Sequence, residues 1–179
     1  AWFVPCQDGE DAAKPTVLFC HGNGGNMGGR VGSLLTFNRL GYNSLIFDYP
    51  GYGESTGEPT EKGTYEAALA CWDYLVDQRG IRPESIIVFG RSLGGGIASW
   101  LAVRANPGVL VLEAAFSSVP DMAALMFPYL PVRLFCRIKY DNVANVKKVG
   151  CPVLVAHSRV DRTCPYEQGE RVYSAALEP

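Results

Sequence analysis

The five residues Gly90-Arg91-Ser92-Leu93-Gly94 are the part of this sequence best suited to chemistry. They follow the apolar run 86–89 and precede an apolar, helix-like segment, 93–105. A serine on such a sharp strand-to-helix turn exposes its Oγ, and glycine two positions away on either side avoids a collision of side chains. The helix N-terminus also favours a developing negative charge. The spacing predicts that Ser92 is a nucleophile for acyl transfer; the alternative is a purely structural glycine-rich turn.

The segment His21-Gly22-Asn23-Gly24 suits the stabilisation of an oxyanion. Glycine lets backbone N–H groups come close to a bound carbonyl oxygen. We expect the N–H groups of Asn23 and Leu93 to be the two donors, with Gly24 as the substitute for Asn23. A phosphate-binding loop is the alternative, but the segment lacks the Lys-Ser/Thr ending of a P-loop and the spacing of a dinucleotide fingerprint.

Asp161 is the best candidate for the acid that orients a catalytic base. It follows the apolar run 152–156, and triads of this type run in the order Ser, acid, His. An aspartate that only caps a turn is the alternative. Glu113 competes, because it ends the apolar run after that of the nucleophile, but we interpret it as a buried carboxylate that braces the loop. We expect Asp48 to fasten its own glycine-rich turn.

The elements that must position these residues alternate between short apolar runs and amphipathic stretches. The runs are residues 2–4, 16–20, 44–47, 85–89, 109–112 and 152–156. A helical stripe covers 65–76, with Thr60 as its cap and Gly80 as its end. Uniformly apolar strands that alternate with helices predict an α/β three-layer sandwich, a mostly parallel twisted sheet with helices on both faces. Ligand sites of such sheets form beyond the carboxyl ends of the strands.

Composition excludes several classes of function. The 179 residues fit one domain, 1–179, with 47% hydrophobic residues, and the net charge of −2 gives no nucleic-acid footprint. No apolar run reaches the roughly 18 residues of a membrane span. The sequence contains no Cys-x-x-Cys pair, so it does not indicate a metal site, and no cofactor is implied. We expect six free thiols in a reducing, cytoplasmic setting, with Cys20 and Cys71 buried, although a Cys151–Cys164 disulfide stays open.

Four motifs in this order resemble the α/β-hydrolase superfamily, and within it the ABHD-like serine hydrolases with a small cap. They are residues 20–26, 47–55, 90–95, and His157-Ser158 with Asp161 and Pro165. The resemblance implies Ser92 as nucleophile, Asp161 as acid, and an oxyanion hole at Asn23 and Leu93. It also implies a cap insertion at about 117–150 and a small-molecule acyl substrate, a carboxylic ester or thioester cleaved through an acyl-enzyme.

The ends of the chain depart from the family pattern. Family members carry the catalytic histidine after a strand that follows the helix near Pro165, and their sheet begins one strand earlier. We therefore expect a chain truncated at both ends, weak or inactive as it stands, with sheet edges open to self-association. His21 matches a position that supports the oxyanion loop, and we expect His157 to be scaffolding rather than the base.

Two other functions and two interpretations of the cap stay open. The chain could be a non-catalytic hydrolase-like module or a serine peptidase of the same fold. The apolar residues of 117–150 either cover an acyl chain or complete the core. Likewise Arg133, Arg137 and Lys139 either meet an anionic head group or form a solvated face, which we favour.

Overall fold

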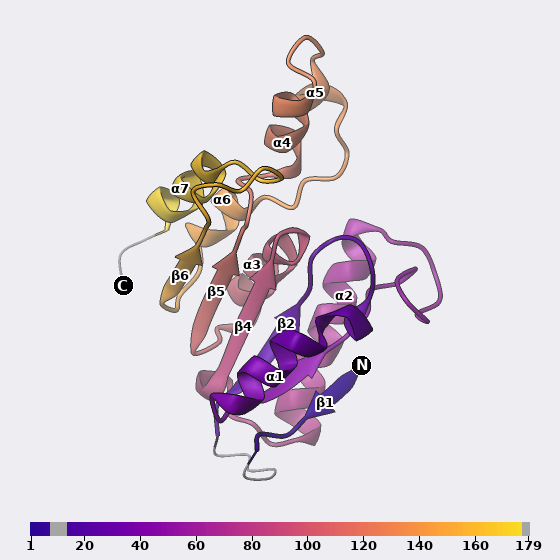
Figure 1. Cartoon of the computed structure of the whole chain (residues 1–179), viewed down its shortest axis with the longest axis vertical. Helices are drawn as coiled ribbons and strands as arrows, with labels where there is room; N and C mark the ends of the chain where they lie inside the picture. Colours follow the sequence, from indigo (N-terminus) through magenta and orange to yellow (C-terminus); the bar gives the residue numbers. More distant parts are fainter. Residues whose placement is uncertain (8–13, 177–179) are drawn as a thin grey trace.

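A six-stranded sheet forms the centre of the protein, in a computed structural model that describes residues 1–7 and 14–176 (Figure 1). The strands are β1 (Trp2–Val4), β2 (Thr16–Cys20), β3 (Asn43–Ile46), β4 (Ile86–Arg91), β5 (Val109–Glu113) and β6 (Val153–Ala156). Their order is β1-β3-β2-β4-β5-β6. Among the described strands, β1 pairs with β3 antiparallel and every other pair is parallel. The prediction of a mostly parallel sheet is confirmed.

The register of the central strands explains their apolar sequences. Leu18 of β2 lies between Leu45 of β3 and Val88 of β4, and Val88 pairs in turn with Leu110 of β5. Every residue of β2 is buried. A strand covered on both faces is apolar throughout instead of alternating, which is why the runs could be recognised in the sequence.

Helices cover both faces of the sheet, as predicted. The short 3₁₀ turn η1 (Met27–Arg30) leads into α1 (Val31–Arg39), whose Leu34 and Phe37 pack on Phe19 of β2. The opposite face carries α2 (Glu61–Asp73), α3 (Leu93–Ala105), α6 (Asn142–Val146) and α7 (Tyr166–Ala175). Figure 1 shows α1 in front of the sheet and α2 and α3 behind it. The chain is therefore a three-layer α/β sandwich.

The boundaries of α2 follow local sequence signals. The Thr60 hydroxyl accepts a hydrogen bond from the Gly63 N–H at 3.0 Å, so Thr60 is the cap that was predicted. The helix continues into one π-helical turn, η2 (Tyr74–Gln78), which the apolar pattern did not reveal. Gly80 then turns the chain with φ of +64°, and the 3₁₀ turn η3 (Pro83–Ser85) leads into β4.

Residues 117–150 contain α4 (Val119–Met126) and α5 (Val132–Phe135) before α6. The two ends of this excursion are tied together, because the Val119 N–H donates to the Lys139 carbonyl at 2.9 Å. In Figure 1, α4 and α5 stand beyond the end of the sheet. The idea that its apolar residues complete the core holds in part for Met122 and is wrong for Leu125, Met126, Phe127, Tyr129, Leu130, Leu134 and Phe135, which are exposed.

The six cysteines are free thiols, so the open alternative of a Cys151–Cys164 disulfide is not realised. Cys20 is fully buried, as expected, whereas Cys71 is only half-buried on α2. Burial raises the pKa of the Cys20 thiol far above its ordinary value. No helix in the described part of the chain has both the length and the apolar character needed to cross a membrane.

Candidate active site

Ser92 sits on the turn between β4 and α3 in a backbone conformation that side chains rarely adopt. Its φ is 52° and its ψ is −116°. The Ser92 N–H donates to the Glu113 carbonyl and the Gly95 N–H donates to the Ser92 carbonyl, both at 2.9 Å. Such strain persists only where the surroundings over-determine it, and it gathers at functional sites. The side chain is half-buried at the carboxyl end of the sheet.

The glycines around Ser92 are required by close packing. A Cβ on Gly94 would lie 2.0 Å from the Cys20 carbonyl oxygen, and one on Gly90 would lie 2.6 Å from the Ala98 Cβ. No side chain fits at either place. A Cβ on Gly22 would lie 3.4 Å from the Ser92 Cβ, so the loop after β2 abuts the serine directly.

The two expected oxyanion donors come from the elements that flank Ser92. Leu93 is the first residue of α3, and the first N–H groups of a helix have no partner within it. Asn23 belongs to the exposed loop that abuts the serine, and its Oδ1 accepts a hydrogen bond from the Tyr52 hydroxyl at 2.5 Å. The Arg30 side chain holds the same loop by donating a hydrogen bond to the carbonyl of Gly24, the residue after Asn23, at 2.6 Å.

Tyr52 is the residue of this site that sequence reasoning missed. In the sequence, Tyr52 is recognised only as part of the Gly51-Tyr52-Gly53 turn, with no role of its own. The available signal was its chemistry, since an aromatic body with a polar tip can pack and hydrogen-bond at once. Its ring lies 5.8 Å from the ring of His21, so it joins the loop after β3 to the loop after β2.

His21 follows β2 directly, at the start of the loop that contains Asn23, and is fully buried. Its Nδ1 donates to the Gly22 carbonyl at 2.9 Å, and its Nε2 lies 3.2 Å from Asp48 Oδ1. Burial lowers the pKa of His21 and outweighs the raising effects of the Gly22 carbonyl and the Asp48 carboxylate. The neutral imidazole is therefore favoured, in a place that supports the loop and does not face the solvent.

Asp48 does more than fasten its own turn. Its carbonyl accepts from the Ser55 hydroxyl at 3.1 Å, which is the role expected from the sequence. Its carboxylate also accepts from the Met27 N–H at 2.7 Å. Asp48 thereby links the loop after β3 to the loop after β2, a contact between segments that the sequence could not reveal.

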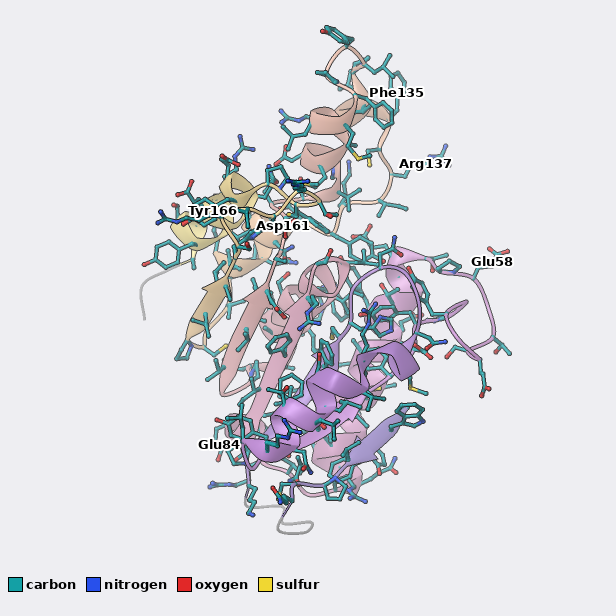
Figure 2. The ribbon with its side chains drawn as sticks, in the orientation of Figure 1. Glu58, Glu84, Phe135, Arg137, Asp161 and Tyr166 are labelled. Atoms are coloured by element: carbon teal, nitrogen blue, oxygen red, sulfur yellow. The ribbon has the colours of Figure 1, made fainter. Side chains whose placement is uncertain are left out.

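Asp161 follows β6, and because β4, β5 and β6 run parallel, it lies at the same edge of the sheet as Ser92. Figure 2 shows Asp161 beyond the end of the sheet. Its Oδ1 accepts from the N–H groups of Thr163 at 2.8 Å and Cys164 at 2.9 Å. The Cys164 bond, with a smaller effect from Thr163, lowers the pKa of the Asp161 carboxyl, so the ionised form is favoured. The ends of β5 and β6 are tied by the Ala114 N–H, which donates to the Ala156 carbonyl at 2.9 Å.

His157 does not face the serine. Its Nε2 lies 2.8 Å from the Cys164 carbonyl and 3.9 Å from Asp161 Oδ2. A Cβ on Gly169 of α7 would lie 2.4 Å from the His157 Nδ1, so this nitrogen faces the helix backbone. The geometry agrees with the expectation of scaffolding.

Glu113 is not the buried carboxylate that the sequence suggested. About a third of its side chain is exposed, and Arg91 Nε donates to its Oε2 at 2.6 Å. The prediction failed because Arg91 lies beside it in the β4–β5 register and provides a partner at the surface. The turn between β4 and α3 is instead held by the Glu113 backbone carbonyl, which accepts a hydrogen bond from the Ser92 N–H.

Sequence comparisons place this arrangement among known proteins. The model of the α/β-hydrolase fold family matches residues 15–165. An uncharacterized Mycobacterium tuberculosis protein is 36% identical over 178 residues, which cover 99% of this chain and 63% of the relative. The lysophosphatidylserine lipase ABHD12 of Gallus gallus is 31% identical over 195 residues, covering 98% and 50%. The chain thus spans less than two-thirds of the length of these relatives.

Comparison with solved structures also finds proteins of the α/β-hydrolase fold. An α/β hydrolase from Vibrio vulnificus superposes with a TM-score of 0.75 at 28% identity, covering 89% of this chain and 61% of that one. Est1E from Butyrivibrio proteoclasticus reaches a TM-score of 0.81 at 21% identity, covering 98% and 80%, which shows likeness of fold alone. With the family match over most of its length, this chain belongs to the α/β-hydrolase fold family.

Proposed function

We propose that the chain carries the nucleophile, oxyanion hole and acid of a serine hydrolase that cleaves a carboxylic ester or thioester. The strained backbone of Ser92, at the N-terminus of a mostly buried 13-residue helix, is the observation that carries the proposal. Backbone strain of this kind at a residue other than glycine costs free energy and gathers at functional sites. Membership of a hydrolase family supports the same chemistry.

The proposed reaction proceeds in two steps. The Ser92 Oγ attacks the carbonyl carbon while its proton passes to a base, and the N–H groups of Asn23 and Leu93 stabilise the oxyanion. Collapse of the tetrahedral intermediate breaks the bond to the leaving alcohol or thiol, which takes the proton from the base and leaves an acyl-serine. Water then attacks the acyl-serine with help from the same base, which releases the acid and restores Ser92.

The base is the part of this machinery that the two histidines of the sequence do not supply. His21 is buried beneath the oxyanion loop, and both nitrogens of His157 face other groups. Loss of a triad base costs a factor on the order of 10⁴ to 10⁶ in turnover. We propose that the 179-residue chain reacts slowly by itself, and that Asp161 serves to orient a histidine from outside these residues.

The substrate class is an acyl ester with an apolar chain. The avian relative is by name a lipase for lysophosphatidylserine. We propose that residues 117–150 form a cap, whose exposed apolar residues beyond the carboxyl end of the sheet suit an acyl chain. A non-catalytic module is the second candidate, favoured by the positions of the two histidines. The peptidases among the solved structures are below 25% identity and carry no argument about activity.

A fluorophosphonate probe tests the nucleophile. We expect slow, stoichiometric labelling of Ser92 in the chain, faster labelling when imidazole is added as an external base, and no labelling in Ser92→Ala. Ser158→Ala is the matched control, because Ser158 is an exposed serine at the same sheet edge, and it should label like the parent. A folded chain that stays unlabelled at every imidazole concentration is a non-catalytic module. Turnover of peptide amides in addition to p-nitrophenyl esters would show a peptidase instead.

A further inference from the structure

The exposed apolar side chains of the protein gather on one short segment. Of the 15 large apolar residues exposed in the described chain, eight lie within 125–138, which we call the cap tip. They are Leu125, Met126, Phe127, Tyr129, Leu130, Leu134, Phe135 and Ile138. Leu134 is 82% exposed and Phe135 is 75% exposed, whereas large apolar side chains are usually buried in the core of a domain. A concentration of exposed apolar side chains in one segment points to an interaction site.

The charged side chains within the cap tip itself are basic, and the nearest acids, Asp121 and Glu61, lie at its base. Residues 122–140 contain Arg133, Arg137 and Lys139 and no acidic residue, in a chain with 18 acids and a net charge of −2. Arg133 is paired at 2.8 Å with Asp121 at the base of α4. Figure 2 shows Phe135 near the end of the cap and Arg137 projecting outward beside it. The Lys139 ammonium donates to the Cys136 carbonyl at 2.8 Å. The tip is thus apolar, with Arg137 as its outward-projecting basic residue.

The cap tip is held out from the body by a defined stem. The Glu61 carboxylate accepts from the N–H groups of Lys139 at 2.8 Å and Tyr140 at 2.9 Å, which fixes one side. On the other side, the Ser117 N–H and hydroxyl both donate to Gln168 Oε1 of α7, at 3.1 and 2.6 Å. A fixed stem presents the apolar residues outward and keeps them from folding back on the core.

We propose that the cap tip docks on an anionic lipid surface. Apolar and aromatic side chains bordered by lysine and arginine suit the boundary between head groups and acyl chains, and each basic residue near an anionic surface adds to binding. A second copy of this chain fits less well, because the Arg137 side chains of two facing tips would repel each other. The proposal concerns binding alone and does not depend on Ser92 being a nucleophile.

Vesicle flotation of the chain carrying Ser92→Ala tests the proposal without lipid hydrolysis. We expect binding to phosphatidylcholine vesicles that contain phosphatidylserine, at least about five-fold stronger than to phosphatidylcholine alone. The double variant Leu134→Ser/Phe135→Ser should weaken binding at least about ten-fold. Arg137→Gln should weaken it about five-fold and reduce its salt dependence.

Control substitutions of the same residue types come from the C-terminal end of α1, at Arg39 and its C-cap Leu40. Leu40 is 63% exposed and Arg39 is exposed beside it, so Leu40→Ser and Arg39→Gln should bind vesicles like the parent. The proposal is overturned if the folded parent chain binds neither kind of vesicle, or if the cap-tip variants bind as the parent does. It is also overturned by a lipid-free dimer that the double variant abolishes, because the occupant of the tip is then a second copy.

Discussion

The turn that carries Ser92 and the loop that carries Asp161 lie at the same edge of the sheet but are held in different ways. The turn is in the middle of the molecule, where Gly90 and Gly94 touch Ala98 and the Cys20 backbone with no space for a side chain. The Asp161 loop follows β6, an edge strand whose Leu154 is 56% exposed. It is shaped by hydrogen bonds within itself.

This difference separates two ways of positioning a side chain at the proposed site. Close packing fixes the serine because any movement of the turn would collide with backbone from β2. Local hydrogen bonds fix the carboxylate less firmly, because each contributes only about 1 kcal/mol to stability. The serine side of the site is therefore expected to be rigid and intolerant of substitution, and the acid side adaptable.

The largest effect is expected from Gly94→Ala. Its Cβ would lie 2.0 Å from the Cys20 carbonyl oxygen and 2.7 Å from that of His21, so α3 must move away from β2. We expect a loss of about 3 kcal/mol or more in the free energy of unfolding, or no folded protein at all. Urea unfolding followed by circular dichroism measures it.

Gly32→Ala is the matched control for that substitution. Gly32 lies in α1, and a Cβ there would meet nothing within 4 Å. Alanine is the better helix former, so the control should be neutral or stabilised by up to about 1 kcal/mol. Equal stability of the two variants would show that the turn is not held by close packing.

The next effect is a dependence of stability on pH that comes from His21. Its pKa is lowered in the folded state by burial, so the unfolded chain takes up the proton first as the pH falls. The stabilisation is complete above the ordinary value of 6.5 and is lost as the pH drops below it. Urea unfolding between pH 8 and pH 5 should show a steeper loss in the parent than in His21→Gln. Parallel curves for the two proteins would contradict the assignment.

The sequence predicted the packed side of the site well. The apolar runs define β2 and β4, and Gly90-x-Ser92-x-Gly94 defines the turn between β4 and α3. These signals are local, because burial on both faces makes a strand apolar and close packing requires glycine. The bounds predicted for α3, 93–105, agree with the structure.

Contacts between segments distant in sequence were not predictable. The Tyr52 hydroxyl on Asn23, the Met27 N–H on Asp48 and the Arg91–Glu113 pair join different loops or strands. None has a sequence signal, because each arises only once the sheet order brings the segments together. The exposure of the cap tip could not be predicted from the sequence for a related reason. Its apolar composition is the same whether or not another element covers it.

A smaller effect is expected on the acid side of the site. Asp161→Ala removes two hydrogen bonds at the surface, to Thr163 and Cys164, and should cost about 1 kcal/mol at neutral pH. Asp161→Asn keeps an oxygen acceptor and should cost less. Because the pKa of Asp161 is lowered in the folded state, its contribution is present above its ordinary value of 3.8 and is lost as the pH falls below it.

The same two variants, Asp161→Ala and Asp161→Asn, also test whether Asp161 affects the reactivity of Ser92 in this chain. If no histidine of this chain links the acid to the serine, neither substitution should change the rate of fluorophosphonate labelling of the 179-residue chain by as much as ten-fold. A drop on the order of 10⁴, as when the acid of a working triad is removed, would mean that one of the two histidines does act as the base.

The smallest effect on stability is expected at the cap tip. Leu134 is 82% exposed, so Leu134→Ser should change the free energy of unfolding by no more than about 0.5 kcal/mol. Leu112, which is fully buried in β5, should lose about 2 to 5 kcal/mol when changed to alanine. A large loss at Leu134 would show that the tip packs against the body in solution. A negligible loss means that its apolar surface stabilises nothing within the chain, so its composition must be explained by something that the tip meets.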